Sequence, residues 1–113
     1  MFQLFQPNVP TSTVDELKSS IDNQEKITIV DVRTDGEYKK GRIKNSIHVP
    51  VDNIIEQITN VAPDKNAKIF VYCLSGSRSA IAVDNMIKSG YTNVYSVAHG
   101  LLAWRAKKCE IEV

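Results

Sequence analysis

Residues 69–79, with the sequence IFVYCLSGSRS, leave this chain few ways to fold, because an apolar run leads there into a loop of small residues. Residues 69–72 are all β-branched or aromatic and show no helical period, which is typical of a strand buried on both faces. Apolar residues then recur at helical spacing from Ala80 to Ile87, and Gly90 offers a helix C-cap. The pattern predicts a strand, a tight loop and a helix in direct succession, with Cys73 just after the strand.

The rest of the chain alternates segments typical of strands and of helices. Strand-like segments fall at residues 8–9, 27–32, 43–50 and 93–97. Helices are expected from the capping-box spacing of residues 13–16, over residues 51–61 and around residues 101–104, with a charged turn or short helix at 33–41. Strands that alternate with helices in one domain, residues 1–113, predict an α/β fold with a mainly parallel central sheet.

A cysteine at this point of an α/β fold is well placed for chemistry. Ligands of parallel sheets gather beyond the carboxyl ends of the strands, where Cys73 is expected. Unpaired N–H groups and the helix dipole stabilise an anion at a helix N-terminus, and the thiolate is the nucleophilic form of cysteine. The alternative is a buried structural cysteine before an ordinary serine-capped helix, which leaves the glycine and arginine of the loop unexplained.

The residues that follow Cys73 form a candidate anion-binding loop: Leu74, Ser75, Gly76, Ser77, Arg78 and Ser79. Gly76 permits a backbone conformation that turns several amides toward one point. The serines are small enough to leave those amides accessible or to cap the helix. Arg78 adds a fixed charge with a planar donor fork that suits oxyanions.

Composition argues against several other classes of protein. Lys and Arg number 14 against 13 Asp and Glu, so a net charge of +1 gives no strong field toward nucleic acid or membrane. The longest apolar run, residues 69–74, is far too short to span a bilayer. Residues 1–7 lack the basic start and apolar core of a signal peptide, and the chain has two cysteines. We expect a cytoplasmic protein with free thiols and with neither nucleic-acid nor membrane partners.

Three motifs, in order along the chain, resemble those of the rhodanese family of single-domain sulfurtransferases. They are IVDVR at 29–33 with EY at 37–38, GRI at 41–43 and SIHVP at 46–50; CLSGSRS at 73–79; and VAHGLLAW at 97–104. The sequence departs from many relatives at Arg42, at residues 44–46, and at His99, which replaces the first of two usual glycines. The resemblance implies a single rhodanese-like domain with helices on both faces of the sheet.

The same resemblance implies sulfur transfer through a persulfide on Cys73. The thiolate would attack the outer sulfur of thiosulfate or a similar small donor, then give that sulfur to cyanide, a thiol or a protein acceptor. We expect the amides of residues 74–79 to hold the thiolate and persulfide, and Arg78 to stabilise the thiolate and an oxyanionic donor. We expect no metal, since Cys73, Cys109, His48 and His99 fit no compact zinc spacing. We also expect the proposed chemistry to need no organic cofactor.

Structural or surface roles are expected for the other reactive-looking residues. Asp31 ends a predicted strand near the site, so Asp31 and Arg33 are candidates for supporting the loop, although a buried structural role is favoured for Asp31. Arg33 and Glu37 lie four residues apart, which predicts a local ion pair. We expect Tyr38 on a solvated face and Cys109 as an exposed spare thiol.

Three alternatives stay open. Cysteine phosphatases and the arsenate reductases related to rhodaneses separate cysteine from arginine by five residues, whereas four separate Cys73 from Arg78. A papain-like pairing of Cys73 with His48 or His99 would activate the thiol in another way. A rhodanese-like module without turnover of its own, or a carrier that hands sulfur only to a partner protein, would keep the same cysteine.

Overall fold

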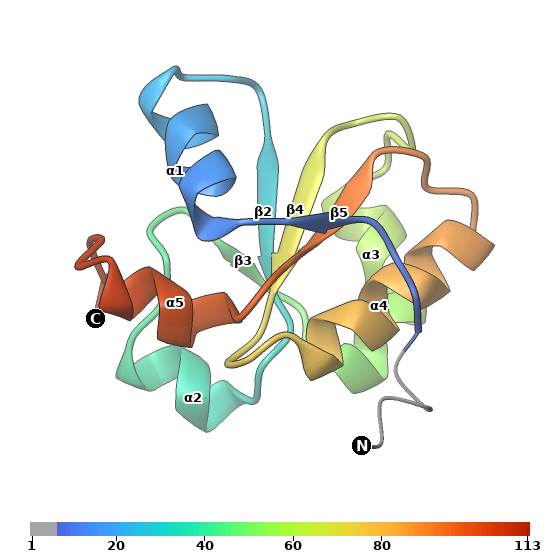
Figure 1. Cartoon of the computed structure of the whole chain (residues 1–113). Helices are drawn as coiled ribbons and strands as arrows, with labels where there is room; N and C mark the ends of the chain where they lie inside the picture. The colour runs from blue at the N-terminus through green and yellow to red at the C-terminus, as the bar shows by residue number, and fades with distance from the viewer. Residues whose placement is uncertain (1–6) are drawn as a thin grey trace.

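The computed structural model describes residues 7–113, which form a five-stranded sheet in the order β1-β5-β4-β2-β3 (Figure 1). All of the strand pairs are parallel. The strands are β1 Thr11–Ser12, β2 Thr28–Asp31, β3 Ile47–His48, β4 Ile69–Tyr72 and β5 Val94–Val97. In the register of β2 and β4, Asp31 lies beside Tyr72, so the carboxyl ends of these two strands meet at one edge of the sheet.

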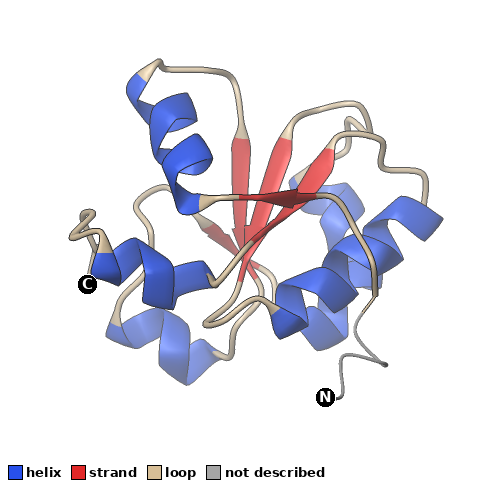
Figure 2. Cartoon of the chain, viewed as in Figure 1, coloured by secondary structure: helices blue, strands red, loops and turns tan. Residues whose placement is uncertain are grey.

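Helices cover both faces of the sheet, as Figure 2 shows. The helices are α1 Val14–Asp22, α2 Asp35–Lys40, the 3₁₀ turn η2 Val51–Asn53, α3 Ile54–Val61, α4 Ser77–Lys88 and α5 Gly100–Ala106. Helices α1 and α5 pack on one face and α3 and α4 on the other. The predicted α/β fold, with a parallel sheet between two helical layers, is therefore confirmed.

Strand β4 lies in the middle of the sheet and is buried along its whole length. Its side chains alternate between two apolar clusters, with Val71 in the α3/α4 layer and Phe70 and Tyr72 in the α1/α5 layer. Trp104 of α5 belongs to the cluster of the α1/α5 layer, and its indole N–H donates to the carbonyl of Glu110. Burial of both faces explains why residues 69–72 read as a continuous apolar run.

Two helices begin with the same capping box. Thr13 and Glu16 cap α1 as the sequence predicts, and Thr34 and Glu37 cap α2 in the same reciprocal way. The second box makes the charged segment at 33–41 a helix rather than a turn, and the helix ends at Gly41.

The first strand lies later than the sequence suggested. Residues 8–9 carry no strand, and β1 pairs Thr11 with Ser96 and Ser12 with Val97. Contact with β5 starts where the Ser96 N–H donates to the carbonyl of Pro10. Proline has no N–H to give to a ladder, so regular pairing begins after this residue.

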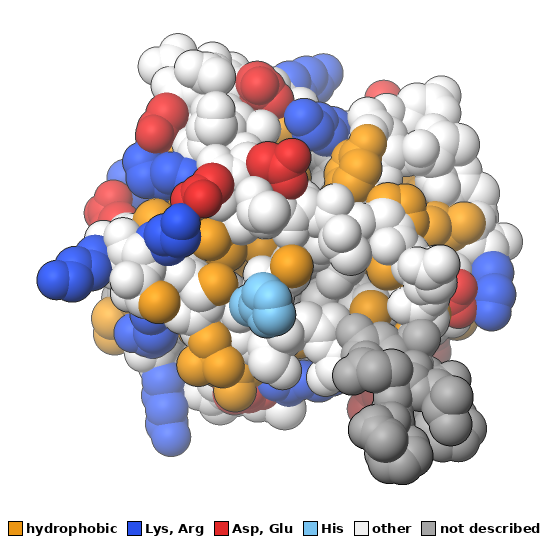
Figure 3. Space-filling model, in the orientation of Figure 1, with side chains coloured by type: hydrophobic (Ala, Val, Ile, Leu, Met, Phe, Trp, Pro, Cys, Tyr) orange, Lys and Arg blue, Asp and Glu red, His pale blue; other side chains and the backbone are white. Residues whose placement is uncertain are grey.

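The surface matches the near-neutral composition. The face drawn in Figure 3 mixes acidic and basic side chains without a field of one sign. Within residues 7–113, no helix is both long enough and apolar enough to cross a membrane. Residues 1–6, part of the stretch in which the sequence predicts no signal peptide, lie outside the described residues.

Candidate active site

The cysteine loop, residues 73–79, joins the end of β4 to the first turn of α4, and two of its amides point at the sulfur. The Gly76 N–H donates to Cys73 Sγ at 3.0 Å, and the Ser79 N–H donates to the same atom at 3.4 Å. Gly76 has a φ of 113°, a conformation that side chains other than glycine rarely adopt. The loop thus directs backbone dipoles at Sγ from the N-terminal end of a 12-residue helix, where a negative charge is stabilised.

A buried hydroxyl also contacts the sulfur. Ser79 Oγ lies 3.6 Å from Cys73 Sγ, 3.1 Å from the carbonyl oxygen of Gly76 and 2.7 Å from Ser96 Oγ. Both serines are buried. Sequence reasoning missed Ser96, although a lone hydroxyl residue in the strand-like VYSV segment was a usable signal.

The segment that follows β5 packs against the cysteine loop. The N–H groups of Leu101 and Leu102 donate to the carbonyls of Cys73 and Leu74 at 2.9 and 3.1 Å. A Cβ placed on Gly100 would lie 2.2 Å from the carbonyl oxygen of Cys73, so only glycine permits this approach. His99 adopts a φ of 60°, which accounts for the glycine usual at this position.

Cys73 has no exposed surface in this conformation, whereas Leu74, Ser75 and Ser77 are exposed around it. Leu74 is 37% exposed, and its side chain is the main apolar group on the outside of the loop. A donor must therefore reach Sγ past these loop side chains.

Arg78 does not extend into solvent from the loop but pairs with Glu37 of α2. Its Nη1 and Nη2 donate to Glu37 Oε1 and Oε2 at 2.7 and 3.1 Å. These hydrogen bonds are the main reason that the pKa of Glu37 falls from 4.5 to about 2. The predicted pair between Arg33 and Glu37 is wrong, because Arg33 pairs with Asp31 instead.

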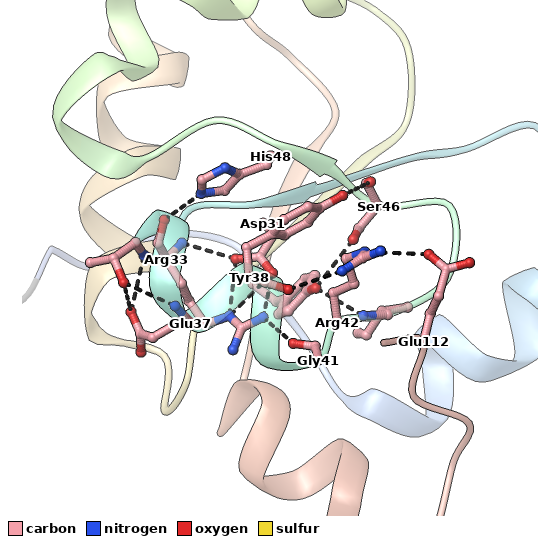
Figure 4. A network of polar contacts seen from close by, with 12 residues as sticks. Asp31, Arg33, Glu37, Tyr38, Gly41, Arg42, Ser46, His48 and Glu112 are labelled. Carbon is pink, nitrogen blue, oxygen red and sulfur yellow. Dashed lines mark hydrogen bonds and ion pairs between the residues drawn. The ribbon is translucent and has the colours of Figure 1, made fainter.

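Asp31 and Arg33 form a buried ion pair at the end of β2 (Figure 4). Arg33 Nη2 lies 2.7 Å from Asp31 Oδ2 and also donates to the carbonyl of Gly41 at 2.7 Å. Asp31 also accepts the backbone N–H of Arg33. The pair ties the end of β2 to the end of α2, which is the buried structural role that the sequence favoured for Asp31.

Tyr38, expected on a solvated face, is half-buried. Its ring stacks on His48 at 4.5 Å, and its hydroxyl donates to the carbonyl of Ser46. Arg42 covers the ring with its guanidinium 4.7 Å from the centroid. Nearby, the Tyr72 hydroxyl accepts the N–H of Ile43, and burial is the main cause that raises the pKa of Tyr72.

Within the described residues, the hydrogen bonds do not support the papain-like alternative. His48 Nε2 contacts the carbonyl oxygen of Arg33 at 2.7 Å, and its Nδ1 lies 3.3 Å from Asp35. The hydrogen-bond partners of Cys73 Sγ in residues 7–113 are Gly76 and Ser79, not a histidine.

Cys109, expected to be exposed, is half-buried against the α1/α5 cluster. Across residues 7–113, no three His, Cys, Asp or Glu side chains gather as metal ligands would.

Comparison with known proteins supports the motif resemblance. Residues 13–107 match the family model described as Rhodanese-like domain. YrkF of Bacillus subtilis, named as a candidate sulfur carrier protein, is 30% identical over 100 residues, which cover 88% of this chain and 53% of YrkF. A tRNA uridine(34) hydroxylase of Photorhabdus laumondii is 34% identical over 110 residues, which cover 89% of this chain and 31% of the hydroxylase. The chain thus spans about half of one relative and a third of the other.

A solved structure gives the same architecture. Thiosulfate sulfurtransferase from Pseudomonas aeruginosa aligns with a TM-score of 0.85 at 24% identity, over 92% of this chain and 20% of that chain. At this identity the likeness shows the fold alone. The family match, in contrast, runs from the N-cap of α1 to just past the end of α5 and includes the whole cysteine loop, and on that match the chain belongs to the rhodanese-like domain family.

Proposed function

We propose that this chain is a sulfurtransferase that takes up a sulfane sulfur as a persulfide on Cys73 and passes it to a nucleophilic acceptor. The observation that carries the proposal is the convergence of the Gly76 and Ser79 amides on Cys73 Sγ. A sulfur atom that accepts two backbone N–H groups at a helix N-terminus is placed to carry negative charge, which the attacking thiolate and the product persulfide both have.

The chemistry needs two displacements and no change in the overall number of electrons. In the first, the Cys73 thiolate attacks the outer sulfur of the donor, the donor S–S bond breaks, and the leaving group departs with the electron pair; with thiosulfate this group is sulfite. In the second, a thiolate or cyanide attacks the outer sulfur of the Cys73 persulfide, and the Cys73 thiolate is restored.

Each loop residue has a place in this scheme. In this proposal the anion-binding loop runs from Leu74 to Ser79 (Leu74, Ser75, Gly76, Ser77, Arg78 and Ser79), with the Gly76 and Ser79 amides directed at Sγ. Asp31 and Arg33 support the loop indirectly by anchoring α2. The short loop and the occupied guanidinium fork of Arg78 both disfavour the phosphatase and arsenate reductase alternative, since that chemistry needs a wide site with a free arginine for a tetrahedral oxyanion.

A persulfide carrier that serves a partner protein is the second candidate. It is favoured by the complete burial of Cys73, which restricts small-molecule access, and by the likeness to YrkF. A carrier would form the same persulfide but would release its sulfur slowly to cyanide.

Intact mass spectrometry tests the proposal. After incubation with thiosulfate or a small hydropersulfide, the wild-type protein should gain one sulfur, about 32 Da, which is reversed by a reducing thiol. Cys73→Ser should gain none, and Cys109→Ser should behave as wild type. Absence of an adduct with both donors contradicts the proposal. Formation of the adduct from either donor without transfer of its sulfur to cyanide selects the carrier.

A further inference from the structure

The charge at the cysteine loop is balanced by a residue from another element. Arg78 is the one charged residue among residues 73–79, and both ends of its guanidinium fork are held by the carboxylate of Glu37 on α2. The two side chains are about equally exposed, at 31% and 30%, so the pair lies at the surface edge of the site.

We propose that Glu37 is a specificity-determining residue: by neutralising Arg78 it leaves the cysteine loop without an uncompensated cation and directs it toward a hydropersulfide donor rather than the thiosulfate dianion. The inference rests on the proposed sulfur transfer and names its donor class.

Thiosulfate and a hydropersulfide differ in the negative charge that they bring to the cysteine loop. Thiosulfate brings two negative charges to a thiolate that already carries one, and this repulsion needs a compensating cation close by. The loop offers the N-terminal dipole of α4, which is equivalent to only about half a charge. A hydropersulfide reacts as R–S–SH, with a neutral outer sulfur, so the loop amides suffice.

Glu37 is fixed in place by more than Arg78. Its Oε1 also accepts the N–H and the hydroxyl of Thr34, both at 3.0 Å, as the N3 member of the capping box of α2. The pKa of Glu37, about 2, keeps the carboxylate charged at neutral pH. Helix α2 is in turn anchored through the bond from Arg33 to the carbonyl of Gly41. Glu37 is therefore held in place at the start of α2, and a donor that binds Arg78 must break both of its hydrogen bonds to this fixed carboxylate.

The donor step balances without an added oxidant. The Cys73 thiolate attacks the terminal sulfur of R–S–SH, a Cys73 S–S bond forms, and the donor S–S bond breaks. R–S⁻ leaves with the electron pair, and the proton of the transferred S–H group passes to solvent or to the leaving thiolate.

The test compares second-order rates of Cys73 persulfide formation from thiosulfate and from glutathione hydropersulfide. Three proteins are used: wild type, Glu37→Gln and Glu16→Gln. Glutamine keeps the shape and acceptor oxygen that the capping box needs. Glu16 is the matched control because it is the N3 residue of the equivalent capping box on α1, distant in sequence from the loop.

In wild type we expect the hydropersulfide to react faster than thiosulfate. Glu37→Gln should raise the thiosulfate rate about three- to tenfold at low salt, with a smaller gain at about 0.5 M salt, where charges are screened within a few ångströms. The hydropersulfide rate should change less than about twofold, and Glu16→Gln should match wild type with both donors.

A wild-type preference for thiosulfate, or an unchanged thiosulfate rate in Glu37→Gln, would overturn the inference. If Glu37→Gln does not fold, the salt dependence of the wild-type rate with thiosulfate tests the inference instead. A thiosulfate rate that is constant or rises with salt supports repulsion at a neutralised loop, and a rate that falls shows a free cation and overturns it. Failure of the proposed function looks different, since neither donor would then load Cys73.

Discussion

The hydroxyl of Ser96 lies 2.7 Å from the hydroxyl of Ser79, whose oxygen is 3.6 Å from the sulfur of Cys73. The Cys73 thiol donates to Ser79 Oγ, and the Ser79 hydroxyl donates its one proton to the Gly76 carbonyl. Because the Ser79 proton is donated to Gly76, the buried Ser96 hydroxyl is the donor to Ser79 Oγ, and we expect the Ser79 proton to turn from the Gly76 carbonyl to the sulfur when Cys73 ionises. Two strands and one helix thus contribute to the environment of Sγ.

Removal of the Ser79 or the Ser96 hydroxyl should lower the reactivity of the Cys73 sulfur. Ser79→Ala deletes the donor beside Sγ and leaves the Ser96 hydroxyl buried without a partner, so we expect a loss of about 1 to 2 kcal/mol in unfolding free energy. Alkylation of Cys73 by iodoacetamide should slow about fivefold, with its pH profile displaced upward, and Ser96→Ala should show a smaller effect of the same sign. The exposed Ser19→Ala on α1 is the control, and equal rates in all four proteins would rule out this role for the hydroxyls.

Gly100→Ala should separate α5 from the cysteine loop. The added methyl group would lie 2.2 Å from the Cys73 carbonyl oxygen, at a φ of 43° that alanine disfavours. We expect a loss of about 2 to 4 kcal/mol in urea unfolding, together with loss of persulfide formation.

Gly36→Ala is the matched control for this substitution. Nothing lies within 4 Å of a Cβ at Gly36, which is inside α2. Alanine there should stabilise the protein by about 0.5 kcal/mol. Equal effects of the two substitutions would show that contact with the loop carbonyls is unimportant.

Local patterns were readable from the sequence, and contacts between distant segments were not. The buried strand at residues 69–72 and the capping box at Thr13 depend on neighbours along the chain, so the sequence predicted both. The same Thr-x-x-Glu pattern is present at Thr34, and it makes Glu37 the N3 residue of a capping box rather than a partner of Arg33. Arg33 precedes the first residue of α2, so a four-residue separation from Glu37 does not put both side chains on one helix face.

The parts of the site that sequence reasoning missed come from across the fold. Glu37 and Arg78 are 41 residues apart, and Ser79 and Ser96 are 17 apart. The sequence placed Arg78 in the loop but could not show what its donor fork contacts, because Glu37 reaches it from α2, a distant segment of the chain. Its expected contact with an oxyanionic donor stays a prediction that the Glu37→Gln comparison addresses.

Glu37 should also make the stability of the protein depend on acid. Its pKa is about 2 in the folded protein against an ordinary value of 4.5, so its contribution is complete above about pH 4.5 and is lost as the pH falls toward 2. Between pH 5 and pH 2 we expect wild type to lose about 1 to 3 kcal/mol more unfolding free energy than Glu37→Gln, the lower end reflecting solvent screening. Urea melts across this range measure the difference, and parallel curves for the two proteins would contradict the pairing with Arg78.

The buried pair at the end of β2 gives the strongest stability prediction. Arg33→Met leaves the Asp31 carboxylate buried without its counter-ion and removes the bond to the Gly41 carbonyl, so we expect a loss of about 3 to 5 kcal/mol in unfolding free energy. Adding Asp31→Asn to that variant should recover part of the loss, because a neutral amide is buried more easily than a carboxylate and its oxygen can still accept the backbone N–H of residue 33. Both variants are compared with wild type by urea denaturation at pH 7. If Asp31→Asn destabilises the Arg33→Met protein further, the cost comes from lost packing of the arginine rather than from an unpaired buried charge.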